Sequence, residues 1–382
     1  MAESTLVLVG TRKGAWIISA GSTRSRWSVK GPLQLGTIVY HFLADPRDTD
    51  HMLMALGGGP LGATVIRSNN QGKTWHEAAR PPAFAGEDST AGQSGRTVDH
   101  VFWLTPGHRT QPGVWYAGTS PQGLFRSVDG GDSWSEVTGL NHHPDFPLWC
   151  GSDGNRTPDG PKLHSIIVDQ TNPAHLLVGM SKGGVFESWD EGDTWAPLNK
   201  GVATDFLPPR DDGAEYDYGH DPHCLVMHPQ ENTRLYQQNR CGIYRLDTHL
   251  TDRWERIGTN MPGDIGDIGF PILVHPREIE TAWVFPMDGS NLWPRTCPGG
   301  EPAVYRTRSG GMSWERKDQG FPEKQAWWTV LRQAMATDLG KPLGIYLGTT
   351  SGQVWASFDE GDNWRSIARD LPHIYSLEIV EI

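Results

Sequence analysis

Short apolar runs separated by turn residues recur along the whole chain, and no long helical pattern interrupts them. In one stretch four such runs follow one another, at residues 39–44, 52–56, 63–67 and 74–78. Runs of this length, bounded by glycine, proline, asparagine or aspartate, are typical of β-strands. They predict an inner strand, two middle strands and an outer strand of one sheet, and the same order repeats in the rest of the chain.

A tryptophan closes each repeat, at intervals of roughly fifty to sixty residues. Seven repeats of one four-stranded sheet predict an all-β fold, a seven-bladed β-propeller with four-stranded blades. Residues 375–382 form a strand without a blade of its own, whereas the first repeat begins at Leu6 and lacks an inner strand. The C-terminal strand is therefore predicted to complete the first blade and to leave no free sheet edge there. The seven tryptophans are Trp27, Trp75, Trp134, Trp195, Trp254, Trp314 and Trp364.

A turn motif precedes most of these tryptophans. Three close copies occupy residues 127–134, 188–195 and 357–364, and looser copies occupy 68–75 and 307–314. Its aspartate can accept local backbone N–H groups, its glycine can take positive φ, and its tryptophan can bury a large ring. A calcium loop would need further oxygen ligands and a distal glutamate between two helices. Because predicted strands flank every copy, we expect a structural hairpin turn.

The motif resembles the Asp-box of the BNR-repeat propellers, and the chain is similar to that sialidase-like superfamily over nearly its full length. Residues 235–242 and 348–353 look like a bacterial group of single-domain BNR-repeat proteins, often labelled glycosyl hydrolase. Such boxes also occur in xyloglucanase-type glycosidases, sorting receptors and photosystem assembly factors, so the resemblance implies a propeller rather than one activity. A true sialidase is not expected, because the Arg-Ile-Pro signature is missing and sialidases have six blades. Xyloglucanase-type enzymes place their cleft between two propellers, and this chain contains one.

Composition agrees with a single domain over residues 1–382, because 46 glycines, 28 prolines and 17 tryptophans supply turns and large ring contacts. The formal net charge of −12 disfavours nucleic acid or an anionic membrane as a partner. The N-terminal residues do not resemble a signal peptide, and no eighteen-residue apolar run occurs, so we expect a cytoplasmic protein. The 4 cysteines have no Cys-x-x-Cys spacing, which fits reduced thiols.

The connections from an outer strand to the next inner strand are long, whereas the box turns are short. The longest are residues 79–97, 136–162 and 198–221, and the connection at 288–302 opens on the same side of the ring. Long loops on one mouth of a rigid scaffold usually carry binding or catalysis. We therefore expect a small-molecule or sugar-like ligand at this mouth.

Counting back five residues from the predicted end of each inner strand places three histidines at one position. They are His100, His164 and His223, with Tyr40 and Phe270 at the same position of the flanking repeats. Equivalent positions share strand parity and height, so the rings should converge near the channel entrance. Three neutral imidazoles with an open position suit one divalent Zn, Fe, Mn or Cu ion. Histidines bonded to water and backbone are the alternative.

Charged and aromatic side chains near this mouth are further candidates. Asp99 or Asp221 would orient an imidazole, and basic turn residues would clamp a carboxylate or phosphate. The acidic loop at residues 211–218 could supply the paired carboxylates of a glycosidase, and loop aromatics could stack on a sugar. The predicted catalytic residues are His100, His164, His223, Asp99 and Arg240. The predicted ligand-binding residues are Tyr40, Trp149, Tyr216, Tyr218, Phe270, Arg12 and Lys182, with Trp293, Trp327 and Trp328 as further aromatics.

Three functions are compatible with these patterns. They are a pocket enzyme acting on a small or sugar-like molecule, a non-catalytic ligand binder, and a protein-interaction scaffold. Histidines together with aspartate and arginine at one mouth favour chemistry, whereas a scaffold more often exposes an apolar or strongly charged patch. The sequence therefore predicts a glycosidase-like or metal-dependent enzyme, and the two other functions stay open.

Overall fold

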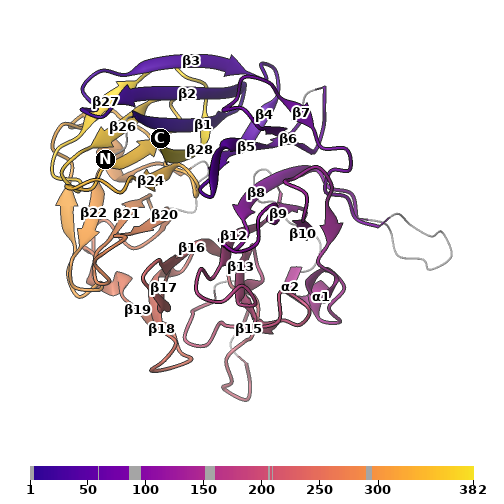
Figure 1. Cartoon of the computed structure of the whole chain (residues 1–382). Helices are drawn as coiled ribbons and strands as arrows, with labels where there is room; N and C mark the ends of the chain where they lie inside the picture. Colours follow the sequence, from indigo (N-terminus) through magenta and orange to yellow (C-terminus); the bar gives the residue numbers. More distant parts are fainter. Residues whose placement is uncertain are drawn as a thin grey trace.

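A computed structural model describes residues 4–58, 60–85, 96–150, 160–204, 207–208, 210–289 and 295–382. The strand groups follow one another around a ring in chain order, from indigo to yellow in Figure 1, and the two ends of the chain lie close together. The architecture is a β-propeller, as predicted from the repeated strands. No helix in the described ranges is long and apolar enough to cross a membrane.

The C-terminal strand closes the ring by completing the first blade, whose strand order is β28-β1-β2-β3. β28 pairs antiparallel with β1, so that Thr5 faces Glu381 and Thr11 faces Ile374. The predicted closure is confirmed, and it pairs two strands that would otherwise be free sheet edges. The strands of this blade are β1 (Ser4–Thr11), β2 (Gly14–Gly21), β3 (Ser28–Leu33) and β28 (Ile374–Glu381).

The next two repeats share one eight-stranded sheet, in which the pair Gly57 and His100 joins β5 to β8. Gly57 allows this approach, because a Cβ there would collide with the Cβ of His100. We interpret the two halves as separate blades. The first half holds β4 (Ile38–Asp45), β5 (Asp48–Gly57), β6 (Thr64–Ser68) and β7 (His76–Glu77). The second holds β8 (His100–Pro106), β9 (Trp115–Ser120), β10 (Leu124–Ser127) and β11 (Ser135–Glu136).

The other four sheets of the described chain each have four consecutive strands, and with the eight-stranded sheet divided in this way we number the blades from one to seven. The fourth blade holds β12 (Leu163–Val168), β13 (Leu176–Met180), β14 (Gly184–Ser188) and β15 (Ala196–Pro197), and the fifth β16 (Pro222–His228), β17 (Glu231–Asn239), β18 (Gly242–Asp247) and β19 (Glu255–Arg256). The sixth holds β20 (Gly269–Val274), β21 (Ala282–Pro286), β22 (Val304–Thr307) and β23 (Glu315–Lys317), and the seventh β24 (Met335–Thr337), β25 (Ile345–Gly348), β26 (Val354–Ser357) and β27 (Arg365–Ala368).

The repeated motif forms the hairpin turn between the third and fourth strands of a blade. The Asp129 carboxylate accepts hydrogen bonds from the Ser127 hydroxyl at 2.8 Å and the Ser133 backbone N–H at 2.9 Å. The Trp134 indole N–H donates to the Gly131 carbonyl at 3.0 Å. Burial by itself raises the pKa of Asp129, but these hydrogen bonds bring it below its usual value. The two carboxylate bonds recur around Asp190 and Asp359, and the indole bond recurs at Trp195, so the predicted hairpin turn is confirmed.

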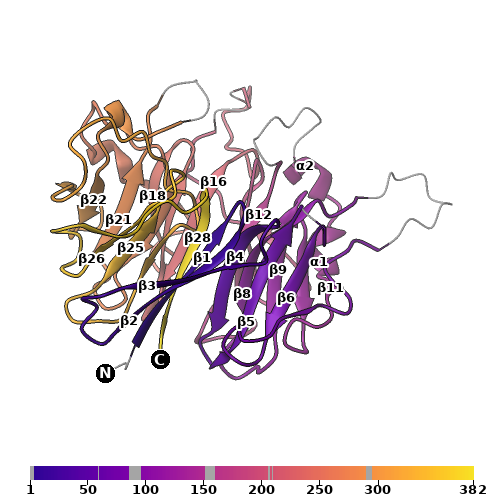
Figure 2. The same cartoon turned by 90° about the horizontal axis from the view of Figure 1, so that it is seen from above.

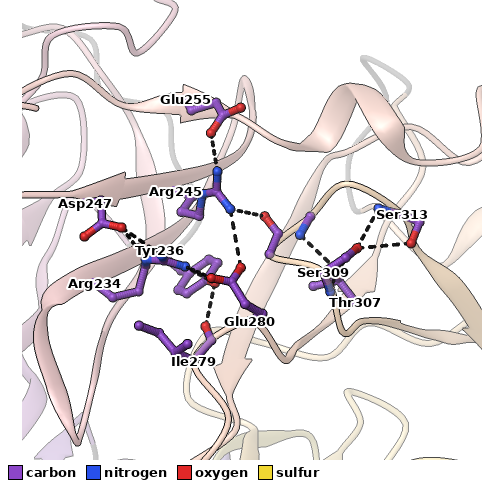
Figure 3. A network of polar contacts seen from close by, with 12 residues as sticks. Arg234, Tyr236, Arg245, Asp247, Glu255, Ile279, Glu280, Thr307, Ser309 and Ser313 are labelled. Atoms are coloured by element: carbon purple, nitrogen blue, oxygen red, sulfur yellow. Dashed lines mark hydrogen bonds and ion pairs between the residues drawn. The ribbon is translucent and has the colours of Figure 1, made fainter. Parts of the chain in front are cut away.

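The fifth repeat lacks the motif, and an ionic network links it to the sixth blade (Figure 3). Arg234 bonds Asp247 at 2.7 Å within the blade and Glu280 of the sixth blade at 3.0 Å. Arg245 bonds Glu255 at 2.5 Å and reaches the sixth-blade carbonyl of Gly310 at 3.1 Å. Charge-assisted contacts therefore join two blades where the turn aspartate is missing.

Most of the core lies between neighbouring blades, and the two mouths of the ring differ. One core cluster combines Tyr116 and Leu124 of the third blade with Phe186 and Trp195 of the fourth. The long connections, with α1 (Thr138–Asn141) and α2 (Phe146–Cys150), lie on the side where the inner strands begin, which we call the long-loop mouth (Figure 2). The box turns and the ends of the inner strands form the opposite side, the box-turn mouth. Two short 3-10 helices, η1 (Gly258–Asn260) and η2 (Pro298–Gly300), complete the described elements.

Candidate functional site

Side chains from the beginnings of several inner strands meet at the long-loop mouth. The ring of His223 in β16 lies 4.8 Å from the ring of Phe270 in β20, measured between centroids. The guanidinium of Arg332, just before β24, lies 4.8 Å from the centre of the same Phe270 ring. His164 in β12 belongs to this group, because the charges of Arg332 and Asp221 both act on its pKa. We call the set the mouth cluster: Lys162, His164, Asp221, His223, Phe270 and Arg332.

Asp221 is the buried carboxylate of the mouth cluster. Its Oδ1 accepts the Lys182 backbone N–H at 3.3 Å, and its Oδ2 lies 3.8 Å from Nε2 of His223. Its backbone carbonyl accepts the Arg240 N–H at 3.0 Å. Burial by itself raises the pKa of Asp221, but His223 and Arg332 outweigh it and the pKa falls to about 2. Asp221 is therefore ionised at neutral pH, and Lys182 and Arg240 contact it through their backbones.

The two histidines of the mouth cluster are buried and neutral. His164 is 0% exposed; its Nδ1 lies 2.8 Å from the Ser165 hydroxyl, and its Nε2 has no hydrogen-bond partner. Burial, followed by the charge of Arg332, lowers the pKa of His164 well below its usual value. His223 donates from Nδ1 to the Gly269 carbonyl at 2.6 Å, and burial lowers its pKa as well.

His100 belongs to a different group of side chains. Its ring stacks on Tyr40 with 4.1 Å between centroids, and its Nδ1 lies 2.7 Å from the Asp99 carboxylate. Tyr40 in turn contacts Tyr375 of the closing strand at 4.9 Å. The Asp99 side chain is 76% exposed, so the pair of His100 and Asp99 borders solvent. The structure thus joins His100, Tyr40 and Asp99 in one group and His164, His223 and Phe270 in another.

The predicted common register of the three histidines is wrong. In the third blade the box serine faces Trp115, and His100 faces Ser120, five residues further along the second strand. In the fourth blade the box serine faces Leu176, and His164 faces Gly179, only three residues further along. His223 falls within a bulge at the start of β16. Each of these inner strands contains one bulge near its histidine, so the bulges do not shift the histidines relative to one another. The count fails because its end residues Thr105 and Asp169 are not equivalent: Pro106 and Val168 are the residues that face Trp115 and Leu176.

The predicted three-histidine metal site is not assembled in the described part of the chain. No group of three or more His, Cys, Asp or Glu side chains there is placed to hold a metal ion. His100 is engaged with Tyr40 and Asp99, away from His164 and His223. A bound Zn, Fe, Mn or Cu ion therefore stays a prediction, and it requires these imidazoles to come together.

Several predicted aromatic ligands lie away from the mouth cluster. Trp149 is 3% exposed and packs on Phe186 at 4.3 Å, which makes it a core residue beneath α2 rather than a ligand-facing one. Tyr216 and Tyr218 are half-buried, 6.0 Å apart, and the Tyr216 hydroxyl donates to the Pro208 carbonyl at 3.0 Å. These two tyrosines therefore order the connection that precedes β16.

The remaining predicted residues lie around the rim. Arg12 is exposed, and its backbone N–H donates to the His373 carbonyl at 2.9 Å. Trp327 is 54% exposed, whereas Trp328 is buried in the core between the sixth and seventh blades. Trp293 lies outside the described residues. Of the two described tryptophans here, Trp327 is the exposed one.

Two carboxylates of the acidic loop are paired with arginines. Asp212 pairs with Arg210 at 2.7 Å, and Glu215 pairs with Arg253 at 2.5 Å. Hydrogen bonds from these arginines lower the pKa of Asp212 and of Glu215. A glycosidase acid needs a raised pKa, so these two carboxylates do not fit that role.

Lys162, Arg332 and Gln333 were not predicted from the sequence. Gln333 Nε2 donates to the Phe102 carbonyl at 3.0 Å, which links the seventh blade to the third across the channel. Lys162 stands directly before β12, as Asp221 stands directly before β16. Comparing the residues at the start of every predicted inner strand, including that of the seventh repeat, would therefore have pointed to these residues.

No family model matches the chain. It is 23% identical to a xyloglucanase from a Paenibacillus species over 301 residues, which cover 74% of this chain and 27% of that protein. The structure resembles the GH74 xyloglucanase from Xanthomonas campestris, with a TM-score of 0.66, 19% identity, and coverage of 97% of this chain and 53% of that one. It also resembles an ancestral GH74 enzyme, with a TM-score of 0.55, 16% identity, and coverage of 90% and 38%. The chain thus spans about half or less of these relatives. The similarities to solved structures establish the β-propeller fold.

Proposed function

We propose that the long-loop mouth binds a carbohydrate-type ligand and that the protein acts on it as a glycosidase-like hydrolase. The similarity to a xyloglucanase over 301 residues supports this ligand class. The observation that carries the proposal is the mouth cluster, in which an ionised carboxylate, two neutral imidazoles, a lysine and an arginine lie together. Such convergent polar groups at one mouth of a rigid fold are typical of a ligand site.

The protonation states of the cluster fit the recognition of hydroxyl groups. Nε2 of His164 is buried without a partner, which costs stability in the unliganded protein. A ligand hydroxyl would satisfy this nitrogen, and Arg332 would donate to hydroxyl oxygens. Asp221, with a pKa of about 2, suits the carboxylate that stays ionised during glycoside hydrolysis.

A non-catalytic ligand binder is the second candidate. Every described Asp or Glu side chain with a clearly displaced pKa has that pKa lowered, including Asp169, Glu215 and Asp221. Two-carboxylate glycoside hydrolysis needs one carboxyl with a raised pKa as the acid. This observation favours binding without hydrolysis.

The two candidates are separated by measuring binding and hydrolysis of xyloglucan oligosaccharides together. Calorimetry would measure binding, and new reducing ends would measure hydrolysis, for the wild type, Asp221→Asn and the exposed-loop control Asp211→Asn. We expect Asp221→Asn to lose hydrolysis by roughly a hundredfold or more while the control is unchanged. Binding without hydrolysis by the wild type selects the second candidate. Absence of binding to xyloglucan and to a panel of other oligosaccharides overturns both.

A metal-dependent form of this function has its own test. Elemental analysis of protein purified without an affinity tag or chelator would measure bound Zn, Fe, Mn and Cu. About one equivalent that disappears in His164→Ala would support a metal ligand role for that imidazole. Metal content that His164→Ala leaves unchanged, or no metal after reconstitution, would exclude it.

A further inference from the structure

A second pocket lies toward the box-turn mouth, and the ring of its lining residue Trp103 lies 6.4 Å from the ring of His164, measured between centroids. It is a cavity of about 270 Å³ lined by residues of β4, β8 and β28. This volume corresponds to roughly nine water molecules. Its polar groups include His41 and Glu378, Trp103 supplies an aromatic wall, and Leu43, Pro46 and Val380 are among its apolar lining.

His41 leaves the negative charge of Glu378 uncompensated. The backbone N–H of Leu104 donates to Nδ1 of His41 at 3.0 Å, so this nitrogen acts as an acceptor. The ring proton therefore sits on Nε2, which donates to the Glu378 carboxylate at 3.2 Å. A second proton on Nδ1 would face the Leu104 N–H donor, which favours the neutral ring. The pair thus carries one net negative charge.

No cationic side chain lines this pocket in the described chain. Arg47 follows the lining residue Pro46, but it is already bonded to the Asp45 carboxylate at 2.7 Å through both Nε and Nη2. Its Nη1 donates to the Gln111 carbonyl at 2.8 Å, and Nη2 also donates to the Val114 carbonyl at 3.0 Å. The Glu378 side chain is 39% exposed, so its charge is available to a ligand.

Trp103 presents an aromatic ring beside this carboxylate. Its indole N–H donates to the Thr105 hydroxyl at 2.9 Å, and that hydroxyl donates to the Ile166 carbonyl at 2.9 Å. The ring of Trp103 also lies 5.5 Å from the His41 ring. The indole is therefore held in one orientation with its own polar group satisfied, and its ring can attract a cation.

We propose that this pocket binds a small organic ammonium ion. One carboxylate without a compensating cation, an oriented indole and apolar walls are the three features that recognise such an ion in a small cavity. A neutral ligand of the same shape would gain the apolar contacts but not the attraction to Glu378 or to the indole ring. This site is independent of the carbohydrate function proposed for the long-loop mouth.

Choline and its neutral isostere 3,3-dimethylbutan-1-ol test the proposal on the intact chain. Calorimetry at constant ionic strength should give a dissociation constant of about 1 mM or lower for choline. The isostere should bind roughly tenfold or more weakly. Glu378→Gln keeps an acceptor for His41 and should remove this preference, whereas Glu381→Gln, on the same strand but outside the pocket lining, should retain it.

Three outcomes would overturn the proposal. They are no choline binding by the wild type, equal binding of choline and the isostere, and an undiminished preference in Glu378→Gln. The isostere comparison uses the wild type alone, so it decides the question even if Glu378→Gln does not fold. A Trp103→Leu variant that folds, checked by circular dichroism, should bind choline more weakly and the isostere about as well as the wild type does.

Discussion

Two histidines of the fourth blade lie at opposite mouths of the ring and have opposite surroundings. His164, at the long-loop mouth, is buried with no hydrogen-bond partner on Nε2. His175, at the box-turn mouth, is also buried, but its Nδ1 lies 2.9 Å from Asp169 and its Nε2 lies 3.0 Å from Glu187. An ionised carboxylate only accepts hydrogen bonds, so both nitrogens of His175 must donate and the ring is an imidazolium.

The pKa values of these two histidines are shifted in opposite directions, downward for His164 and upward for His175. Burial by itself lowers the pKa of His175, but the bonds to Glu187 and Asp169 outweigh burial and raise it. Trp189 stacks on this ring at 3.8 Å, and Asn232 of the fifth blade donates to Asp169 at 2.9 Å. The box-turn side therefore satisfies its charges between blades, as the network around Arg234 also does. At the long-loop mouth, Nε2 of His164 has no hydrogen-bond partner, and the same holds for Nε2 of His228 on the box-turn side.

The largest effect is expected for His175→Leu. Removing the imidazolium leaves Asp169 and Glu187 without their shared partner, which should lower the free energy of unfolding by about 3 kcal/mol. Because the pKa of His175 is raised above 6.5, its stabilisation is complete below that pH and is lost as the pH rises through the raised value. Urea unfolding from pH 6 to pH 9 should therefore show the variant approaching the wild type.

The exposed His76 provides the matched control. His76→Leu, on an outer strand, should change the free energy of unfolding by less than about 0.5 kcal/mol. A loss below about 1 kcal/mol in His175→Leu, or a loss that does not change with pH, would show that His175 is not the imidazolium that the contacts require.

Asp221→Asn should have an intermediate effect, of about 2 kcal/mol near pH 7. The pKa of Asp221 is lowered from 3.8 to about 2, so its stabilisation is present above 3.8 and is lost as the pH falls toward 2. Urea midpoints of the variant and the wild type should therefore differ at pH 7 and converge near pH 2. Midpoints that stay equally far apart at both pH values would contradict the assignment of an ionised Asp221.

His164→Leu should have the smallest effect, within about 1 kcal/mol, because it removes a buried group whose Nε2 is unpartnered. The pKa of His164 is lowered, so the wild type loses stability as the pH falls below 6.5, and the variant should not show this part of the loss. Thermal unfolding at pH 5 and pH 7.5 would measure it. A destabilisation larger than that of His175→Leu would reverse the comparison of the two mouths.

The fold could be predicted because each repeat carries its own local signals. The box turns around Asp129 and Asp190, their tryptophans and the unpaired strand at residues 375–382 indicated the sheets and their closure. The site could be predicted only in part. The long-loop mouth and the residues His164, His223 and Asp221 were named, but the register of His100 depends on where each inner strand ends, which the sequence does not mark.

The positions of two further residues, Arg332 and Trp149, also could not be predicted from the sequence. Arg332 precedes the three-residue strand β24, which is too short to show an alternating pattern. Trp149 is predicted at the mouth because it lies in a long connection, yet it is part of α2 and packs against Phe186. Both positions are decided by contacts between segments that are distant in sequence or irregular in structure.

The pairing of β1 with β28 also determines how the ring responds to force. Ser4 and Ile382 exchange backbone hydrogen bonds of 2.9 and 3.1 Å, at the same end of an antiparallel pair that runs to Thr11 and Ile374. A pull applied to these two ends would load the bonds one after another, as in opening a zip, rather than all at once in shear. The joint that completes the first blade should therefore be the mechanically weakest part of the ring, even though it is paired along its whole length.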